Sequence, residues 1–417
     1  MSIETSGPPE RRANVLEVMP SNKFLLIVAL LVVSLASLRN VPFAEPWGID
    51  LMNLVLYHHC ADGKSPYSIP GAACGDPFGR GMYYPPVLFW SFAWTRSLSL
   101  VKAMQIWSVV QLLAFAAVFY VWVRKIVGVR AGAPDTRTRE WVIFGALLLL
   151  QFPVAFALER GGSDVWAVAF VTLAGVALVR QHYALAGVAL GIATAYKLYP
   201  AFTCAVVVMG VMIADWSRPL RSRERWRFVL VGASAVATFV LLSLVLYSES
   251  KLYFTKVLPA FSGTALMPGT IGHSLGALTS GYPRFGALLM GSLIALWGWA
   301  AGQAFKRADF AAGVAGALAI STYSQKMSWD YNLVTTYPLL MLMFLRAQKD
   351  QRWVILALGL IAIVGEREIY GTPGMGFLTP HLRILLQVAF LVLSAIVIAA
   401  GNPLRDVEPS EPARART

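Results

Sequence analysis

Residues 164–214 read DVWAVAFVTLAGVALVRQHYALAGVALGIATAYKLYPAFTCAVVVMGVMIA, and this stretch decides the class of fold. Three apolar runs, at 164–179, 184–196 and 199–214, are separated only by short polar turns. An apolar helix of about 20 residues crosses the roughly 30 Å hydrocarbon core of a bilayer. Closely spaced runs near this length predict membrane helices joined by tight connections, and therefore an all-α polytopic membrane protein.

Similar runs recur along the whole chain of 417 residues. Hydrophobic residues make up 57% of it and charged residues only 14%, with a mean hydropathy of +0.61. This composition excludes a water-soluble domain with a polar shell. We predict about twelve spans, while the segment 85–100, which polar residues interrupt, either crosses the membrane or lies at its interface. The further runs lie at 24–39, 102–123, 141–158, 228–247, 286–304, 309–323, 331–345, 353–364 and 383–400.

Basic residues are distributed unevenly between the predicted connections. If 85–100 does not cross and the N-terminus is cytoplasmic, most of the 35 Lys and Arg fall on the cytoplasmic side, many of them within 124–139 and 218–227. This is the positive-inside pattern. It predicts a multi-pass protein of a bacterial inner membrane whose polar clusters face the periplasm. The net charge of +13 then indicates contact with anionic membrane lipids, and nucleic-acid binding is not expected.

We expect one membrane domain over residues 23–400. Residues 1–22 are polar and no small-residue cleavage site follows the first run, so they predict a cytoplasmic tail before an uncleaved helix. Residues 40–101 predict a helical first external loop with interfacial helices. Residues 401–417, rich in Pro, Glu and Arg, predict a disordered tail.

Polar clusters gather in the connections assigned to the external side, where ionisable groups at membrane depth mark substrate paths. Asp50 follows the first run and precedes an apolar helical stretch. Its carboxylate suits a general base that accepts a proton from an attacking hydroxyl. Asp is also a common helix N-cap, and the sequence leaves both interpretations open. Further clusters lie at 159–164, 196–200, 271–274, 324–330 and 366–371.

Two cations in these clusters suit an anionic ligand. Arg160 offers a planar fork and Lys197 a point charge, which together match a phosphate or diphosphate group. Arg160 has the alternative of pairing with Glu159 or Asp164. Lys197 has the alternative of extending its charge to the membrane interface.

The loop after Asp50 also holds two adjacent histidines and two cysteines. A disulfide between Cys60 and Cys74 is expected if that side of the membrane is oxidising, and two free thiols are the alternative. His58 and His59 are not accompanied by further ligands at metal-binding spacing, and a zinc site would supply three or four. The sequence therefore predicts no metal site and no cofactor.

Several motifs together, in their order along the chain, carry a family resemblance: Asp50, Gly63-Lys64-Ser65-Pro66-Tyr67, Tyr84-Pro85-Pro86, the turn 159–164, Lys197-Leu198-Tyr199-Pro200 and Ser328-Trp329-Asp330. From roughly residue 24 to 400 the chain resembles the polyprenol-phosphate-mannose-dependent mannosyltransferases of glycosyltransferase family 87, in the GT-C superfamily. The resemblance implies a many-helix membrane fold, a lipid-phosphate sugar donor and an acidic base in the first external loop, which maps onto Asp50.

The implied reaction moves a sugar, mannose first among the candidates, from a polyprenyl-phosphate donor to a hydroxyl of a glycolipid or glycan, with inversion and without a metal. A transporter or flippase of a lipid-linked saccharide, and arabinofuranosyl transfer on the same fold, are the alternatives. In relatives histidines follow the late acidic residue, whereas here Tyr331 and Asn332 follow it. The donor phosphate is assigned to Arg160, Lys197, Lys326 and Arg367, and the sugar and acceptor to His58, Tyr84, Glu159, Asp164, His273, Trp329 and Asp330.

Overall fold

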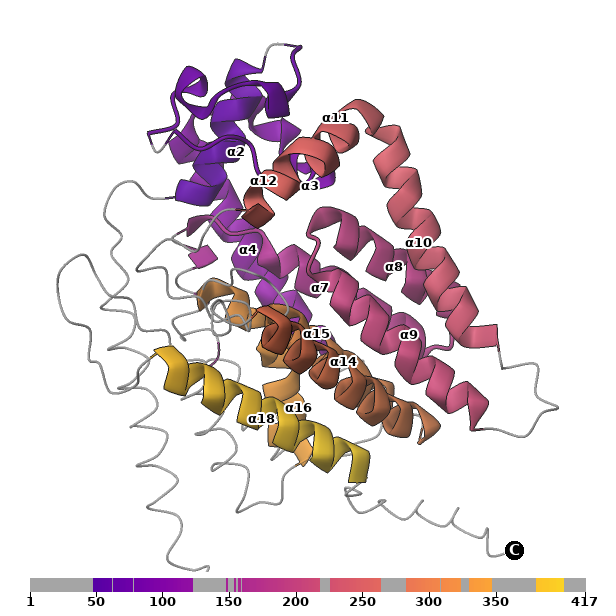
Figure 1. The fold of residues 1–417 in the computed structure, drawn as a ribbon. Helices are drawn as coiled ribbons and strands as arrows, with labels where there is room; N and C mark the ends of the chain where they lie inside the picture. The colour runs from indigo at the N-terminus through magenta and orange to yellow at the C-terminus, as the bar shows by residue number, and fades with distance from the viewer. Residues whose placement is uncertain are drawn as a thin grey trace, which may run out of the picture.

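The computed structural model contains helices and no strand within the residues that it describes, which confirms the predicted all-α class (Figure 1). The described residues are 48–61, 63–77, 79–122, 148, 154, 157–158, 160–217, 226–263, 283–307, 309–323, 330–346 and 380–400.

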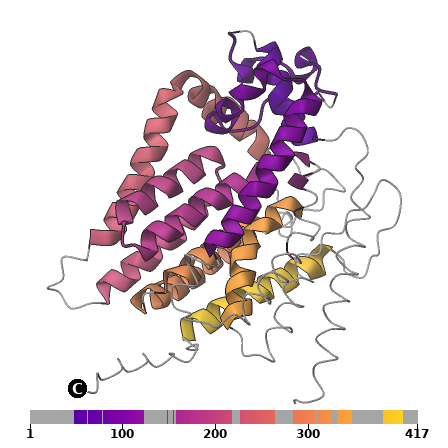
Figure 2. The ribbon, with the colours of Figure 1, turned by 180° about the vertical axis from the view of Figure 1, so that it is seen from behind.

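The N-terminal part of the described chain forms a cap of short helices, residues 48–99, at one end of the molecule (Figure 1). Helix α4, Leu100–Val121, leaves this cap and runs down along the other helices, as Figure 2 shows from behind. The elements of the cap are α2 (Ile49–Cys60), η2 (Pro66–Ser68), η3 (Gly71–Cys74), α3 (Pro86–Ser91) and η4 (Ala93–Ser97).

The remaining helices form the bundle. Its first part consists of α7 (Asp164–Val179), α8 (Tyr183–Tyr196), α9 (Pro200–Trp216) and α10 (Arg227–Val245). A bent segment of α11 (Tyr247–Leu252), the π-helix η8 (Tyr253–Val257) and α12 (Leu258–Gly263) then turns back toward the cap (Figure 1). The last part consists of α14 (Pro283–Lys306), α15 (Phe310–Tyr323), η9 (Asp330–Thr336), α16 (Tyr337–Arg346) and α18 (Pro380–Ala400).

The predicted spans coincide with these helices wherever the structure describes them. Three helices are long and apolar enough to cross a membrane, Leu100–Val121, Arg227–Val245 and Arg284–Lys306, and the shorter apolar helices account for further predicted runs. The runs 24–39 and 353–364, and nearly all of 141–158, lie outside the described residues. The structure thus supports a helical membrane protein, and the count of about twelve spans stays a prediction.

The segment 85–100, which the sequence left undecided, folds into α3 and η4 of six and five residues. At 1.5 Å per residue α3 extends only about 9 Å, far less than a bilayer core requires. Both elements pack into the apolar core of the cap together with α2 and α4, through buried side chains that include Leu51, Tyr57, Leu88, Phe89, Phe92 and Trp107. The structure therefore favours the interfacial interpretation of this segment.

Small residues set the spacing between α8 and α10. A Cβ atom on Gly187 or Gly191 would collide with the carbonyl oxygen of Val231 or Ala235, one turn apart on α10. Such close backbone packing is typical of membrane helices, where small residues at four-residue spacing let two helices approach. The other side of α10 carries exposed apolar residues such as Leu241 and Val245, as a lipid-facing surface requires.

Three helix ends meet at the end of the bundle away from the cap. Asp215 near the end of α9 is fully buried and accepts hydrogen bonds from the guanidinium of Arg227, including one of 2.7 Å from Nε. Arg227 also donates to Tyr183 Oη over 3.2 Å. These hydrogen bonds of Arg227 join α8, α9 and α10 at this end of the bundle. Because α7, α8, α9 and α10 alternate in direction, the polar groups described next lie at the opposite end.

Candidate functional site

Helix α2 carries Asp50 in its first turn. The helix is preceded by Gly48, which has a φ of 78° and therefore a left-handed backbone that favours glycine. A Cβ at this position would also collide with Met104 of α4. Gly48 is the N-cap and no side-chain hydrogen bond caps the helix, so the N-cap interpretation of Asp50 is wrong. The carboxylate is instead buried inside the cap, with a residue exposure of 4%.

Arg160 forms an ion pair with Asp50. Its Nη2 donates to Asp50 Oδ1 over 3.4 Å. The next residue, Gly161, has a φ of 68°, and a Cβ on it would lie 2.7 Å from Leu51 Cβ. Trp107 Nε1 donates to the Gly161 carbonyl over 3.1 Å. These contacts hold the turn before α7 against the first turn of α2 and so place Arg160 at the carboxylate.

A second arginine, which the sequence analysis did not select, also reaches this carboxylate. Arg80 Nη1 lies 4.0 Å from Asp50 Oδ1. The same guanidinium donates to Asp76 Oδ2 from Nε over 3.2 Å and from Nη2 over 3.0 Å. Asp76 Oδ2 also accepts a hydrogen bond of 3.0 Å from Asn53 Nδ2. Asn53 lies three residues after Asp50 and hence on the same face of α2, which is the one signal that sequence reasoning had available.

The loop that carries Asp76 and Arg80 is fastened to α2 at several points. Cys60 and Cys74 form a disulfide with a Cα–Cα distance of 5.4 Å, and a cross-link over so short a loop contributes about 3 kcal/mol. Tyr57 Oη donates to the carbonyl oxygens of Ile69 over 3.0 Å and Arg80 over 3.3 Å. The backbone path of this loop, and with it the place of Arg80, is therefore set from α2.

The two oxygens of Asp50 have different surroundings. Oδ1 receives both arginines, whereas Oδ2 is buried and has no hydrogen-bond partner among the described residues. Tyr83 lies close by: burial and the negative charge of Asp50 raise the pKa of its phenol. Tyr83 Oη donates to Tyr84 Oη over 3.1 Å, which places the predicted Tyr84 beside the site. A buried, unpaired carboxylate oxygen can accept a proton or a hydrogen bond from a ligand hydroxyl.

Lys197 and Asp164 form a separate ion pair at the start of α7. Lys197 Nζ lies 2.9 Å from Asp164 Oδ2. Asp164 Oδ1 accepts hydrogen bonds of 2.9 Å from Tyr199 Oη and 2.8 Å from Asn332 Nδ2. The residue is 1% exposed, so protein groups surround this carboxylate. The two predicted phosphate-binding cations, Arg160 and Lys197, thus contact different carboxylates, Asp50 and Asp164.

His58, predicted to contact sugar or acceptor, is buried between α2 and α3 with an exposure of 1%. Its Nε2 donates to the Phe89 carbonyl over 2.7 Å, and its ring stacks on that of Phe89 with centroids 4.0 Å apart. Eight residues of helix separate it from Asp50, which is about 12 Å along the axis. These contacts correspond to a role in packing and give no support to a sugar contact.

The buried imidazole predicts a pH dependence of stability. Burial, ahead of the nearby Arg96 charge, lowers the pKa of His58 below its ordinary value of 6.5. Below pH 6.5 the unfolded chain therefore binds a proton that the folded chain excludes, and the free energy of unfolding should fall as the pH falls. Thermal unfolding in detergent from pH 7.5 to about 5 measures this slope.

The variant His58→Gln should reduce that slope, because it removes the titrating ring. His59→Gln, on the exposed side of the same turn, is the matched control and should keep the slope. An unchanged slope in His58→Gln would show that another group is responsible.

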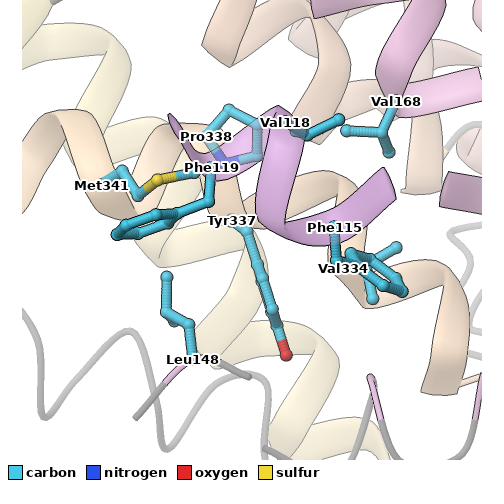
Figure 3. Close-up of a pocket in the computed structure, with 9 residues that line it drawn as sticks. All are labelled: Phe115, Val118, Phe119, Leu148, Val168, Val334, Tyr337, Pro338 and Met341. Atoms are coloured by element: carbon cyan, nitrogen blue, oxygen red, sulfur yellow. The ribbon is translucent and has the colours of Figure 1, made fainter. Parts of the chain in front are cut away.

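Two cavities differ in what they can hold. The first, of about 20 Å³, is lined by apolar side chains that converge from α4, α7, η9 and α16 (Figure 3). It has the volume of about one water molecule and is no substrate site. The second, of about 390 Å³, falls within the usual range of small-molecule sites. Its lining is mainly aromatic and comprises Ser91, Phe92, Trp94, Ile106, Trp107, Val110, Trp166, Phe170 and Tyr196.

The larger cavity, which we call the aromatic pocket, adjoins the carboxylate site through Trp107. The ring of Trp107 lines the pocket, while its Nε1 binds the carbonyl of Gly161, the neighbour of Arg160 in the chain. Trp107 also stacks on Trp166, with ring centroids 6.2 Å apart. An apolar pocket and a charged site thus share one wall, an arrangement that suits an amphipathic ligand.

The remaining predicted site residues are not placed by the structure. Within the ranges that it describes, no group of three His, Cys, Asp or Glu side chains is positioned to hold a metal ion. Asp330 begins η9, but its side chain lies outside the described part of the molecule. The other predicted site residues outside the described part are Glu159, His273, Lys326, Trp329 and Arg367.

The sequence model of glycosyltransferase family 87 matches residues 83–327, which is more than half of the chain. The chain belongs to glycosyltransferase family 87. The predicted family is thereby confirmed, and the matched range contains Arg160, Asp164, Lys197 and all the residues that line the aromatic pocket. No curated protein and no solved structure matches the chain. The family indicates a glycosyltransferase, and the site around Asp50, which precedes the matched range, is its candidate active site on the geometry described above.

Proposed function

We propose that this family 87 glycosyltransferase transfers a hexose, most simply mannose, from a polyprenyl-phosphate donor to a hydroxyl of a glycolipid or glycan, with inversion. The observation that carries the proposal is the environment of the Asp50 carboxylate. This carboxylate is buried, two guanidiniums approach one of its oxygens, and the other oxygen has no partner among the described residues. It is the arrangement that a general base beside an anionic donor requires.

In the proposed reaction Asp50 Oδ2 accepts the proton of the acceptor hydroxyl, from which it must stand within hydrogen-bond reach. The acceptor oxygen attacks the anomeric carbon from the face opposite the phosphate. The bond between that carbon and the phosphate oxygen breaks, and polyprenyl phosphate leaves with one more negative charge. Arg160, whose anionic partner Asp50 has just been neutralised, stabilises the charge that develops on the phosphate.

The aromatic pocket supports a lipid-linked donor. Its volume, its apolar lining and its place between the cap and α4 suit the first units of a branched hydrocarbon chain, whose burial is favourable in proportion to the apolar area removed from water. A sugar nucleotide would instead require polar partners for its base and ribose. The shared wall at Trp107 lets a chain lie in the pocket while its phosphate reaches Arg160.

Filling the pocket predicts a selective loss of long-chain donors. Val110 lines the pocket, and Val110→Trp should raise the KM for polyprenyl-phosphate mannose by about tenfold, because the chain loses about 1.4 kcal/mol of binding. The KM for an analogue with a very short chain should change much less. Val109, its exposed neighbour in α4, gives the matched control Val109→Trp. Equal effects on both donors would place the chain elsewhere.

The orientation of the site follows from the distribution of charge in our proposal. The carboxylate site lies at the capped end of the bundle, whereas Arg227 lies at the other end, and Arg227 belongs to a stretch of the sequence, 218–227, that is rich in basic residues. The positive-inside rule assigns the basic end to the cytoplasm, so transfer would take place on the periplasmic face of a bacterial inner membrane.

Membranes that contain the protein test the proposal when they are supplied with radiolabelled polyprenyl-phosphate mannose and, separately, with a labelled nucleotide mannose under conditions that block lipid-donor synthesis. The proposal expects label in a new glycosidic product only from the lipid donor, with the opposite anomeric configuration. Label from the nucleotide alone would overturn the donor class. Movement of label across the membrane without a new covalent bond would favour the transporter alternative.

A further inference from the structure

We propose that Arg80 is a second phosphate-binding residue of this active site, and that Asp76 and Asn53 are positioning residues that hold it there. The inference rests on the proposed function, since it concerns the same donor phosphate. Two guanidiniums from separate segments converge on Asp50 Oδ1, Arg160 at 3.4 Å and Arg80 at 4.0 Å. Oδ2 stays without a partner among the described groups, so both cations stand on the side of the carboxylate opposite to its proposed proton-accepting oxygen.

The contacts of Arg80 fix the direction of its guanidinium. Because the group is planar and rigid, the bonds of Nε and Nη2 to Asp76 determine where Nη1 lies. That atom is directed toward Asp50. The Asp76 side chain is completely buried, so its carboxylate is shielded from solvent and accepts its hydrogen bonds from protein groups. Asn53, donating from α2, ties this pair to the helix that carries Asp50.

The charge balance explains why one arginine would not be sufficient. Asp50 and Asp76 each contribute one negative charge, which Arg80 and Arg160 offset. A phosphodiester donor adds a further negative charge close to an ionised base, and like charges in a poorly solvated site repel strongly. If Arg80 were absent, the base, Asp76 and the phosphate would face Arg160 alone. Two guanidiniums between base and phosphate allow both anions to be present before the proton moves.

After proton transfer the same pair serves the leaving group. Asp50 is then neutral and the departing phosphate carries two negative charges, so the attraction of Arg80 and Arg160 shifts from the carboxylate to the phosphate. An interaction that strengthens as the reaction proceeds lowers the barrier, whereas one that is equal throughout affects only binding. Arg80 is therefore expected to affect both the donor KM and kcat.

The test compares Arg80→Gln, Arg80→Lys and Asp76→Asn in the full-length protein, with inhibition by polyprenyl phosphate as a measure of phosphate binding. Arg80→Gln should raise the inhibition constant and the donor KM by about tenfold or more, as expected for loss of a charge-assisted hydrogen bond. Arg80→Lys keeps the positive charge but loses the planar guanidinium. Its inhibition constant and donor KM should lie between those of Arg80→Gln and those of the unmodified protein. Arg96→Gln, an exposed arginine of the same cap, is the matched control and should change neither value.

Asp76→Asn should shift the inhibition constant in the same direction, and it should add little to Arg80→Gln in the double variant, because it acts through Arg80. If Arg80→Gln lowers only the thermal stability and leaves the inhibition constant unchanged, Arg80 is a structural link between loop and helix and the inference is wrong. If polyprenyl phosphate does not inhibit even the unmodified protein, the proposed function itself is wrong. This result differs from inhibition that is present but unaffected by Arg80→Gln, which contradicts only the inference about Arg80.

Discussion

Asp50→Asn is expected to reduce sugar transfer by about 10²- to 10⁴-fold, the usual contribution of a general base. The amide has nearly the same shape, so the packing of α2 against α4 and the turn at Gly161 should persist. It cannot accept a proton from the acceptor hydroxyl at neutral pH. Initial rates in membranes with equal amounts of protein measure the loss.

The same variant makes a second, opposite prediction for binding. Removing the negative charge of Asp50 removes its repulsion of the donor phosphate and leaves both arginines without that partner. Polyprenyl phosphate should therefore inhibit Asp50→Asn at least as strongly as it inhibits the unmodified protein. Glu249→Gln, an isosteric change in α11 beside the cap, is the control and should alter neither rate nor inhibition. Undiminished transfer by Asp50→Asn would exclude Asp50 as the base.

Among the variants considered, Asp164→Ala is expected to lower the free energy of unfolding most, by about 3–5 kcal/mol. Asp164 accepts hydrogen bonds from Lys197 and Tyr199, in the turn between α8 and α9, and from Asn332 in η9. Removing the carboxylate leaves the ammonium of Lys197 largely buried, with a side-chain exposure of 14%, and without its counter-charge. Thermal or chemical unfolding in detergent measures the change.

A double-mutant cycle separates the ion pair from the rest of the network. Lys197→Met combined with Asp164→Asn should be more stable than the sum of the two single losses predicts, because neither charge is then left unpaired. Asp309→Asn is the matched control, since Asp309 caps α15 with Oδ1 and asparagine caps equally well. If Lys197→Met instead keeps full stability and raises the donor KM, Lys197 serves the phosphate, as the sequence interpretation held.

The apolar runs predicted the helices well because hydropathy over about 20 residues depends on composition alone. The runs 164–179, 184–196 and 199–214 correspond closely to α7, α8 and α9. Segment 85–100 was ambiguous for the same reason: its composition suits an interface and a short span equally. Only its division into α3 and η4 distinguishes the two.

The site was predictable only in part. Asp50 was selected because an acidic residue after the first run matches a family motif. Arg80 was missed because its proximity to Asp50 depends on how the intervening loop folds, which neither periodicity nor spacing encodes. The partner of Lys197 was equally hidden, since 33 residues separate it from Asp164. Pairings between distant segments are tertiary properties, whereas the existence of a cation in a connection is a property of the sequence.

The cross-link between Cys60 and Cys74 ties the proposed active site to an oxidising compartment. It joins the end of α2, the helix that carries the proposed base Asp50, to the loop that holds Arg80 and Asp76. A chain still in a reducing environment lacks this covalent tie, and its loop is held only by weaker contacts such as those of Tyr57. Under the proposed function, completion of the active site would then coincide with arrival of the loop at an oxidising face of the membrane.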